Sequence, residues 1–286
     1  MNWLRNVRER RLFYIVILLL TIVLIGWRYI MSGHLDINGV LDNIISAAVI
    51  SLVTLSFFWL IPRDFPDYQF VVQIDPAKAN DFHMQALAST TYWWHQGHFG
   101  RWTRAVVAPA LEKRAHSRIR WIIIDPRNDD ICKKYVDFRN HHRLVVHDIW
   151  NVMKLKCEIY STLFAAFQYH HSKSPISVDV YVSDHFSTFR LDLTEKAVFI
   201  TTVDSRDPPI MLTQESAWYS VLKDQFEYVL KQTTKVVLED DCVEYSDNIN
   251  GEYVKKILNS MGFDVMDDVI ISYVIENWNK PYYKYN

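Results

Sequence analysis

The chain begins with two long apolar runs, LFYIVILLLTIVLIGWRYIM at residues 12–31 and NIISAAVISLVTLSFFWLI at residues 43–61. As helices rising about 1.5 Å per residue, both runs match the roughly 30 Å hydrocarbon core of a bilayer. The second run carries no charged residue, and the first carries Arg28 near its end. The pattern predicts a hairpin of two transmembrane helices over residues 1–61.

The residues that flank these runs predict an orientation. Four arginines precede the first run, and the loop after it holds Asp36 and Asp42 but no lysine or arginine. The positive-inside rule then places the N-terminus in the cytoplasm, and a second span returns the chain to that side. A cleaved signal peptide is disfavoured because the first run continues into Trp27-Arg28-Tyr29 rather than into a small-residue cleavage site.

Small and polar residues recur on one face of the second run. Asn43, Ala47, Ser51 and Thr54 follow spacings of four, four and three, which align them along a helix. Small residues let membrane helices pack closely, which is the simpler interpretation. The alternative is a face that lines a water path in a homo-oligomer, because two helices cannot enclose a pore.

Composition limits the function classes. The chain has 286 residues and a net charge of -2, which argues against bulk nucleic-acid binding. Cys132, Cys157 and Cys242 lack metal-ligand spacing, so we expect reduced thiols, no metal site and no cofactor.

Residues 62–67 form a short connector with two prolines, and residues 68–286 are predicted to form an α/β sandwich domain. Residues 91–102 are predicted to be a loop rich in aromatic and basic residues. Predicted strands cover residues 68–74, 120–124, 176–183, 186–193 and 197–203. Predicted helices cover residues 75–89, 103–116, 148–170, 216–231, 250–261 and 267–277, and another helix begins at residue 128 or 129.

A candidate catalytic motif lies between two predicted strands. His185 and Asp192, in HFSTFRLD, are spaced as in the His-x-Lys-x4-Asp motif of the phospholipase D superfamily. Residues 86–205 resemble a half-domain of that superfamily, which implies a histidine nucleophile acting on phosphorus. Ser187 stands where the family has its lysine, and the family uses two such motifs, so activity would need a dimer. The substitution favours a degenerate domain that binds without catalysis, because losing an oxyanion stabiliser costs about 3–4 kcal/mol. A strand-end histidine with a local hydrogen bond is the alternative for His185.

The basic and aromatic residues provide a second candidate site. Arginines beside a helix N-terminus suit phosphate, and tryptophans can stack on bases. The alternative is that the tryptophans belong to the core and the charges to a solvated face. The candidates for binding nucleic acid or phosphate are His98, Arg101, Arg104, Arg139, Arg143, Trp94 and Trp102.

The domain layout, with the pattern WWHQGHFGRWTR…RWIIIDPRNDDICKKYVDFR, resembles the two-transmembrane effectors of bacterial anti-phage retron systems. That resemblance implies a toxin of the bacterial inner membrane that acts in abortive infection. It also implies a partner complex of reverse transcriptase with an RNA–DNA hybrid, which holds the toxin silent. Two alternatives stay open: a membrane-tethered phospholipase D-like phosphodiesterase, and a receptor for a nucleotide second messenger.

Overall fold

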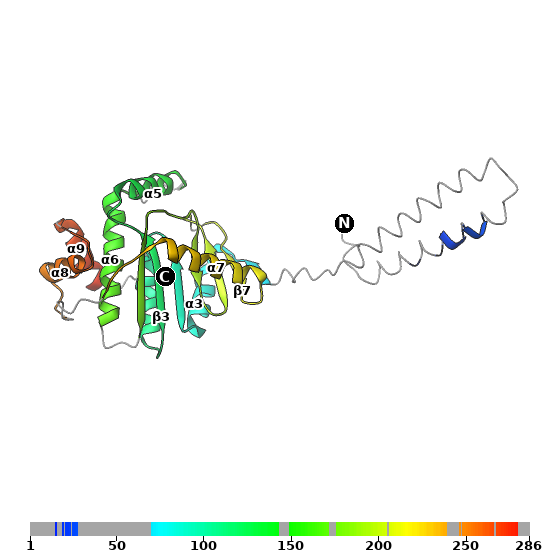
Figure 1. Cartoon of the computed structure of the whole chain (residues 1–286), viewed down its shortest axis with the longest axis horizontal. Helices are drawn as coiled ribbons and strands as arrows, with labels where there is room; N and C mark the ends of the chain where they lie inside the picture. Colours follow the sequence, from blue (N-terminus) through cyan, green and yellow to red (C-terminus); the bar gives the residue numbers. More distant parts are fainter. Residues whose placement is uncertain are drawn as a thin grey trace. The chain divides into compact units, whose positions relative to one another are not determined.

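The computed structural model describes residues 70–142, 149–171, 176–204, 206–238, 246, 248–265 and 267–279, and residues 15, 19, 21–23 and 25–27 near the start (Figure 1). The chain divides into two compact units, Met1–Phe65 and Pro66–Asn286. The described residues of the first unit are helical, and several of their apolar side chains are exposed, such as Leu19 and Val23.

The predicted membrane hairpin is corrected by the structure. Within the part of the chain that the structure describes, no helix combines the length and the apolar character that crossing a bilayer requires. The second predicted span, the connector at residues 62–67 and the stripe of Asn43, Ala47, Ser51 and Thr54 lie outside the described residues. The described residues therefore do not support the predicted transmembrane anchor, nor the inner-membrane localisation that depended on it.

The second unit alternates strands and helices along the chain. In order, its elements are β1 (Val71–Gln73), η3 (Pro76–Lys78), α3 (Ala79–Ser89), β2 (Tyr92–Gln96), the π-helical turn η4 (Thr103–Val107), α4 (Ala108–Glu112), β3 (Arg118–Ile124), α5 (Asp129–His142), α6 (Val152–His171), β4 (Ser177–Ser183), β5 (Arg190–Leu193), β6 (Ala197–Thr201), β7 (Ile210–Thr213), α7 (Ala217–Gln232), β8 (Thr234–Lys235), α8 (Gly251–Ser260) and α9 (Asp268–Asn279).

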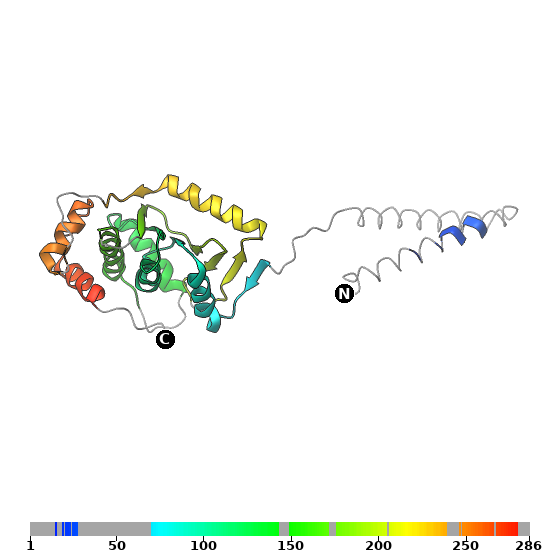
Figure 2. The same cartoon turned by 90° about the horizontal axis from the view of Figure 1, so that it is seen from below.

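The described strands form one mixed sheet in the order β1-β7-β6-β5-β2-β3-β4-β8. β2, β3 and β4 are parallel neighbours, and the other pairs are antiparallel. The helices of the α/β domain cover both faces of this sheet, as Figure 2 shows from below. The α/β class is thus confirmed, while the likeness to a phospholipase D half-domain stays a prediction.

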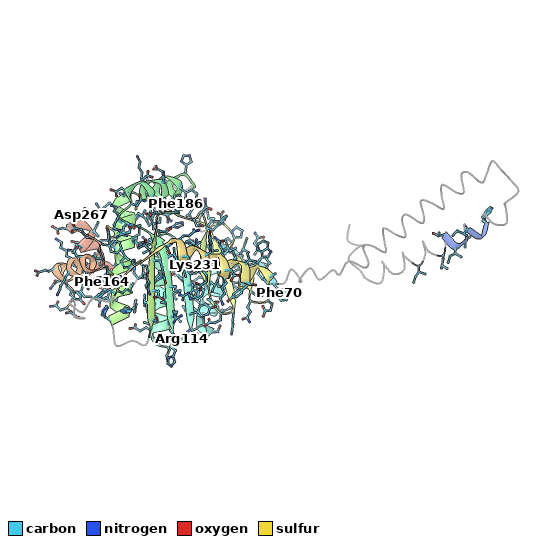
Figure 3. The ribbon with its side chains drawn as sticks, viewed as in Figure 1. Phe70, Arg114, Phe164, Phe186, Lys231 and Asp267 are labelled. Carbon is cyan, nitrogen blue, oxygen red and sulfur yellow. The ribbon has the colours of Figure 1, made fainter. Side chains whose placement is uncertain are left out.

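The two faces of the sheet are covered unequally. On the first face, α3, α4, α5 and α6 bury the apolar residues of the central strands, and α8 and α9 extend the same core. On the second face, α7 packs its Tyr219, Phe226 and Leu230 against the sheet. Figure 3 labels Phe186 and Arg114 at opposite ends of the sheet; Phe186 packs against α5 at the end where the parallel strands finish.

Side-chain alternation along β3 explains this arrangement. Ile119, Trp121 and Ile123 have no exposed surface and face the helices of the first face. Arg118 and Arg120 alternate with them, so they lie on the second face, toward α7. The first face of β3 is therefore core, and the second carries charge.

Most predicted elements are confirmed, with shifted ends. Asp75 caps its helix through a 3.0 Å bond from the Ala77 amide, and Ser216 caps α7, as aspartate and serine commonly do at helix starts. The predicted loop at residues 91–102 is wrong in its first half, because Tyr92–Gln96 is β2 in the middle of the sheet. β7 and β8 are strands that the pattern did not predict.

Candidate functional site

Asp192, from the predicted catalytic motif, is a buried carboxylate on β5. The antiparallel register places it opposite His95 of β2. It accepts hydrogen bonds of 2.8 Å from His95 Nδ1 and from Trp93 Nε1. Burial alone would raise the pKa of Asp192, but the charge and hydrogen bond of His95 lower it to about 2. Asp192 is thus an ionised group that orients His95 and Trp93.

His185, the other residue of the predicted motif, is separate from the pair of Asp192 and His95. It is exposed in the turn after β4, and its backbone N–H donates to Ser183 Oγ at 3.1 Å. No hydrogen bond among the described residues joins His185 to Asp192. A catalytic role for His185 stays a prediction, and the described contacts supply no partner that would activate it.

His98, a predicted phosphate ligand, lies inside the domain. Its Nε2 is 2.8 Å from the carbonyl oxygen of Ser187, and its ring stacks on Tyr135 with centroids 4.2 Å apart. Burial lowers the pKa of His98 to about 3, so the imidazole is neutral and donates this bond. A buried neutral imidazole offers no charge to a phosphate.

Arg101 and Arg104 are held by one buried carboxylate. Glu158 of α6 is fully buried and forms ion pairs with both arginines, with the Arg104 pair at 3.1 Å. Arg104 also donates to the Glu158 carbonyl oxygen and to Thr162 Oγ1, each at 2.9 Å. These contacts hold the two guanidinium groups inside the domain.

The other predicted ligands lie apart. Arg139 is buried over the Trp150 ring at 4.1 Å and donates to Tyr135 Oη at 2.9 Å. Trp102 packs on Trp93 on the first face of the sheet, whereas Trp94 packs on Phe226 on the second. Arg143 lies outside the described residues. The predicted nucleic-acid surface is therefore not formed by its described members, because burial and internal pairing engage them.

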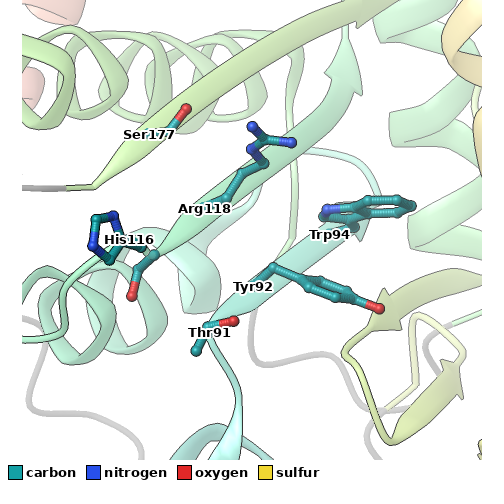
Figure 4. A pocket seen from close by; sticks show the side chains of 7 residues that line it. Thr91, Tyr92, Trp94, His116, Arg118 and Ser177 are labelled. Carbon is teal, nitrogen blue, oxygen red and sulfur yellow. The ribbon is translucent and has the colours of Figure 1, made fainter.

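A surface hollow of about 430 Å³ lies instead where β2, β3 and β4 begin. We call it the strand-start hollow; its lining residues are Thr91, Tyr92, Trp94, His116, Ser117, Arg118 and Ser177 (Figure 4). It is opposite to the carboxyl ends of the parallel strands, where open α/β sheets usually bind ligands.

Strand register brings these residues together. The alignment of β2, β3 and β4 sets Tyr92 beside Arg118, and Arg118 beside Ser177. The next row on the same face holds Trp94, Arg120 and Asp179. Residues from three strands thus form one polar and aromatic patch, which α7 covers only in part.

Two buried donors at the hollow have no partner. Ser117 is 1% exposed and Trp94 is 7% exposed, yet Ser117 Oγ and Trp94 Nε1 make no hydrogen bond within the described chain. An unpaired buried polar group costs about 1–3 kcal/mol. Figure 4 shows the nitrogen edge of the Trp94 indole on the side toward Arg118.

Exposed groups surround these two donors. Arg118, His116 and Ser177 are exposed, and His116 adopts a positive φ of 59°. Tyr92 is half-buried; burial raises the pKa of its hydroxyl, which also pairs with the Tyr219 hydroxyl at 3.1 Å. The hollow thus combines an aromatic wall with donors, a set suited to an anion that carries an aromatic group.

The ring of Trp94 is already covered on its faces. Its centroid is 5.3 Å from that of Phe226 and 5.1 Å from that of Tyr92. The Arg120 guanidinium lies 4.5 Å from the Trp94 ring, and the Lys223 ammonium lies 6.0 Å away. A ligand in the hollow therefore meets the N–H edge of Trp94 rather than its face.

Of the residues that line the hollow, Trp94 was predicted from the sequence as a ligand, whereas Ser117, Arg118 and His116 were not. The available signal was RIRWIII, in which arginines alternate with residues of a buried strand. Among the described residues, no group of three or more His, Cys, Asp or Glu side chains could hold a metal ion.

No family model matches the chain, and no curated protein matches it. Among solved structures it is similar to TrmBL2, described as an archaeal chromatin protein with a novel mode of DNA binding. The two share 10% identity with a TM-score of 0.33, over 69% of this chain and 65% of that one. This chain thus spans slightly less than two thirds of that protein, and so low a score supports no conclusion about function.

The likeness to TrmBL2 is too weak to bear on the expected nucleic-acid partner. No comparison supports a lipid bilayer or a reverse transcriptase as partner. The resemblance to two-transmembrane effectors is corrected, because it required a hairpin of spanning helices that the described residues do not supply.

Proposed function

We propose that the α/β domain binds a nucleotide or a nucleic acid at the strand-start hollow. The observation that carries the proposal is the pair of buried, unpartnered donors, Ser117 Oγ and Trp94 Nε1, beside the exposed Arg118. Phosphate oxygens are strong acceptors for such donors, and a guanidinium matches phosphate well.

The charge around the hollow supports the same ligand class. None of its seven lining residues is acidic. The neighbouring carboxylate of Glu195 is saturated by donors: it accepts from the Thr90 hydroxyl, from the Thr91 amide at 2.8 Å and from the Tyr92 amide at 3.1 Å. Its charge is therefore partly compensated where a phosphate would approach.

We propose that the strand-start hollow binds its ligand without catalysing a reaction. Among the described residues that line the hollow, no nucleophile has an adjacent base, since Ser117 Oγ makes no hydrogen bond to a histidine there. His185 and Asp192, the predicted catalytic pair, lie at the opposite end of β4 and on β5. Among the functions expected from the sequence, this geometry favours a receptor for a nucleotide.

A binding measurement with an arginine variant tests the proposal. The probe is a 5′-phosphorylated single-stranded oligonucleotide with fluorescein at its 3′ end, and the readout is fluorescence anisotropy. We expect saturable binding to the full chain that weakens as salt increases. Arg118→Ala should weaken binding about tenfold, because a hydrogen-bonded ion contact to phosphate is lost.

Arg206→Ala is the matched control. Arg206 is an exposed arginine that pairs with Asp204 in the segment between β6 and β7, at the other end of the sheet. Arg206→Ala removes the same charge as Arg118→Ala, and binding of the probe should stay unchanged. Equal weakening by both variants would show that charge alone attracts the probe. Absence of saturable binding both of this probe and of a free mononucleotide would refute the proposed function.

A further inference from the structure

The donors of the strand-start hollow specify which part of a nucleotide enters it, an inference that rests on the proposed function. Trp94 Nε1 and the Arg118 guanidinium can only donate hydrogen bonds. The hydroxyls of Ser117 and Ser177 and the His116 imidazole add three further groups that are able to donate. These five groups come from three strands and from the loop before β3, and their residues all line the one hollow.

A terminal phosphate satisfies such a donor set better than an internal phosphodiester does. An internal phosphodiester presents two non-bridging oxygens and one negative charge. A terminal phosphate presents three oxygens and a charge of about -1.5 to -2 at pH 7. The terminal group thus offers the acceptors that the buried Ser117 and Trp94 donors lack.

The aromatic wall has room for one base. Proteins that bind a run of single-stranded nucleotides stack successive bases on several open rings. Here Phe226, Tyr92 and Arg120 pack on the Trp94 ring, whereas Tyr92 itself is only half-buried. The volume of about 430 Å³ also lies in the range of small-molecule pockets, roughly 300–1,000 Å³.

We infer that the hollow binds the terminal phosphomonoester of a nucleotide, with the phosphate on Ser117, Trp94 Nε1 and Arg118 and one base against Tyr92. A free mononucleotide and the phosphorylated end of a strand share this chemistry. The inference excludes an internal or cyclic phosphodiester as the preferred ligand.

Calorimetric titration of the full chain with three adenosine compounds tests the ligand class. Adenosine 5′-monophosphate should bind at least about tenfold more tightly than adenosine or 3′,5′-cyclic adenosine monophosphate, because only the first has a terminal phosphate. If the cyclic compound binds equally well, the inference fails and the proposed function stands. If none of the three binds and the oligonucleotide does not bind either, the proposed function fails.

A second pair of titrations separates the two sources of the phosphate. The same oligonucleotide is compared with a 5′-phosphate and with a 5′-hydroxyl. A preference for the phosphorylated end, with weaker binding of the mononucleotide, identifies strand ends as the ligand. The reverse order identifies the free mononucleotide, and equal binding of both oligonucleotides overturns the inference.

Ser117→Ala tests the buried hydroxyl with two readouts. Binding of the monophosphate should weaken about tenfold, the effect of losing a hydrogen bond to a charged group. The thermal midpoint should stay unchanged or rise, because the removed hydroxyl has no hydrogen-bond partner among the described residues. Ser260→Ala on α8, whose hydroxyl bonds the Ile257 carbonyl, is the control and should leave binding unchanged. A lower thermal midpoint with unchanged affinity would show that the hydroxyl serves the fold or holds water only.

Discussion

At the residue scale, buried ionisable groups make the stability of the domain depend on pH. Burial lowers the pKa of His98 to about 3, and the charges of Arg190, Arg139 and His95 act in the same direction. Its bond to the Ser187 carbonyl partly opposes this shift. Because the folded pKa lies below the ordinary value of 6.5, the unfolded chain binds the proton first as pH falls.

We therefore predict acid destabilisation between pH 6.5 and about 3, at about 1.4 kcal/mol per pH unit for His98. Urea unfolding at pH 7 and pH 5 should differ by roughly 2 kcal/mol from this residue, and the lowered pKa of His83 adds a loss of the same sign. His98→Phe should be less stable at pH 7 yet lose less on acidification. An equal loss in that variant would remove His98 as the cause.

Gly97 is required by its contact with His95 rather than by its backbone angles. A Cβ atom at Gly97 would lie 2.3 Å from His95 Nε2 and 2.7 Å from Cε1. The His95 ring cannot move away easily, because its Nδ1 bonds to the buried Asp192. The glycine thus permits the pair of His95 and Asp192 to form.

Gly97→Ala should reduce the free energy of unfolding by about 1–3 kcal/mol, the usual effect of overpacking a core. Gly251→Ala is the control, since a Cβ there meets Ile271 Cγ2 at an ordinary 3.4 Å. In a His95→Ala background the cost of Gly97→Ala should largely disappear. Chemical denaturation of the four variants measures this, and an undiminished cost in that background would contradict the contact.

At the element scale, Glu158 joins three helical segments. Its carboxylate receives Arg101 and Arg104 from η4 and its flank, and the Tyr273 hydroxyl from α9. Burial alone would raise the pKa of Glu158, but Arg104 and Arg101 lower it below its ordinary range. The ionised carboxylate therefore fixes η4 and α9 onto α6.

Glu158→Gln should cost about 3–5 kcal/mol, since it removes the buried charge that compensates Arg104. Glu227→Gln offers a matched comparison, because Glu227 pairs with Arg120 at 2.9 Å but its side chain is 43% exposed. Such a pair contributes at most about 1 kcal/mol. Comparable losses in urea unfolding for the two variants would show that burial of the Glu158 cluster has little energetic effect.

The elements also differ in how well local sequence patterns predict them. Helices with clear caps, such as those that follow Asp75 and Ser216, were predictable because a local hydrogen bond determines where they start. β2 was not, because Tyr92–Gln96 is buried on both faces and its five residues lack the alternation of a half-exposed strand. β7 is short and follows two prolines, so its pairing with β6 depends on tertiary contacts.

At the scale of the whole molecule, the candidate site was less predictable than the fold. Arg101 and Arg104 are basic residues near a helix start, a pattern that indicates phosphate binding. Their partner Glu158 lies more than fifty residues away, so the sequence alone could not show the pairing. The strand-start hollow likewise depends on the register of three strands that are distant in sequence.

The second unit should fold without the first. Its described core is built within residues 70–279: Ile74 and Phe82 pack with Phe199, while Ile271 and Val274 pack with the core around α6. We predict that residues 66–286 give a cooperative thermal transition within about 2–4 °C of the transition of the α/β domain in the full chain, the shift that ~1 kcal/mol produces at this size. Their affinity for adenosine 5′-monophosphate should also match that of the full chain.

A chain that begins at residue 90 should fail to fold, because loss of β1 and α3 exposes Phe199 and the first face of the sheet. Circular dichroism and calorimetric titration of the three chains measure both outcomes, and an unfolded 66–286 beside a folded full chain would show that the first unit contributes to the core.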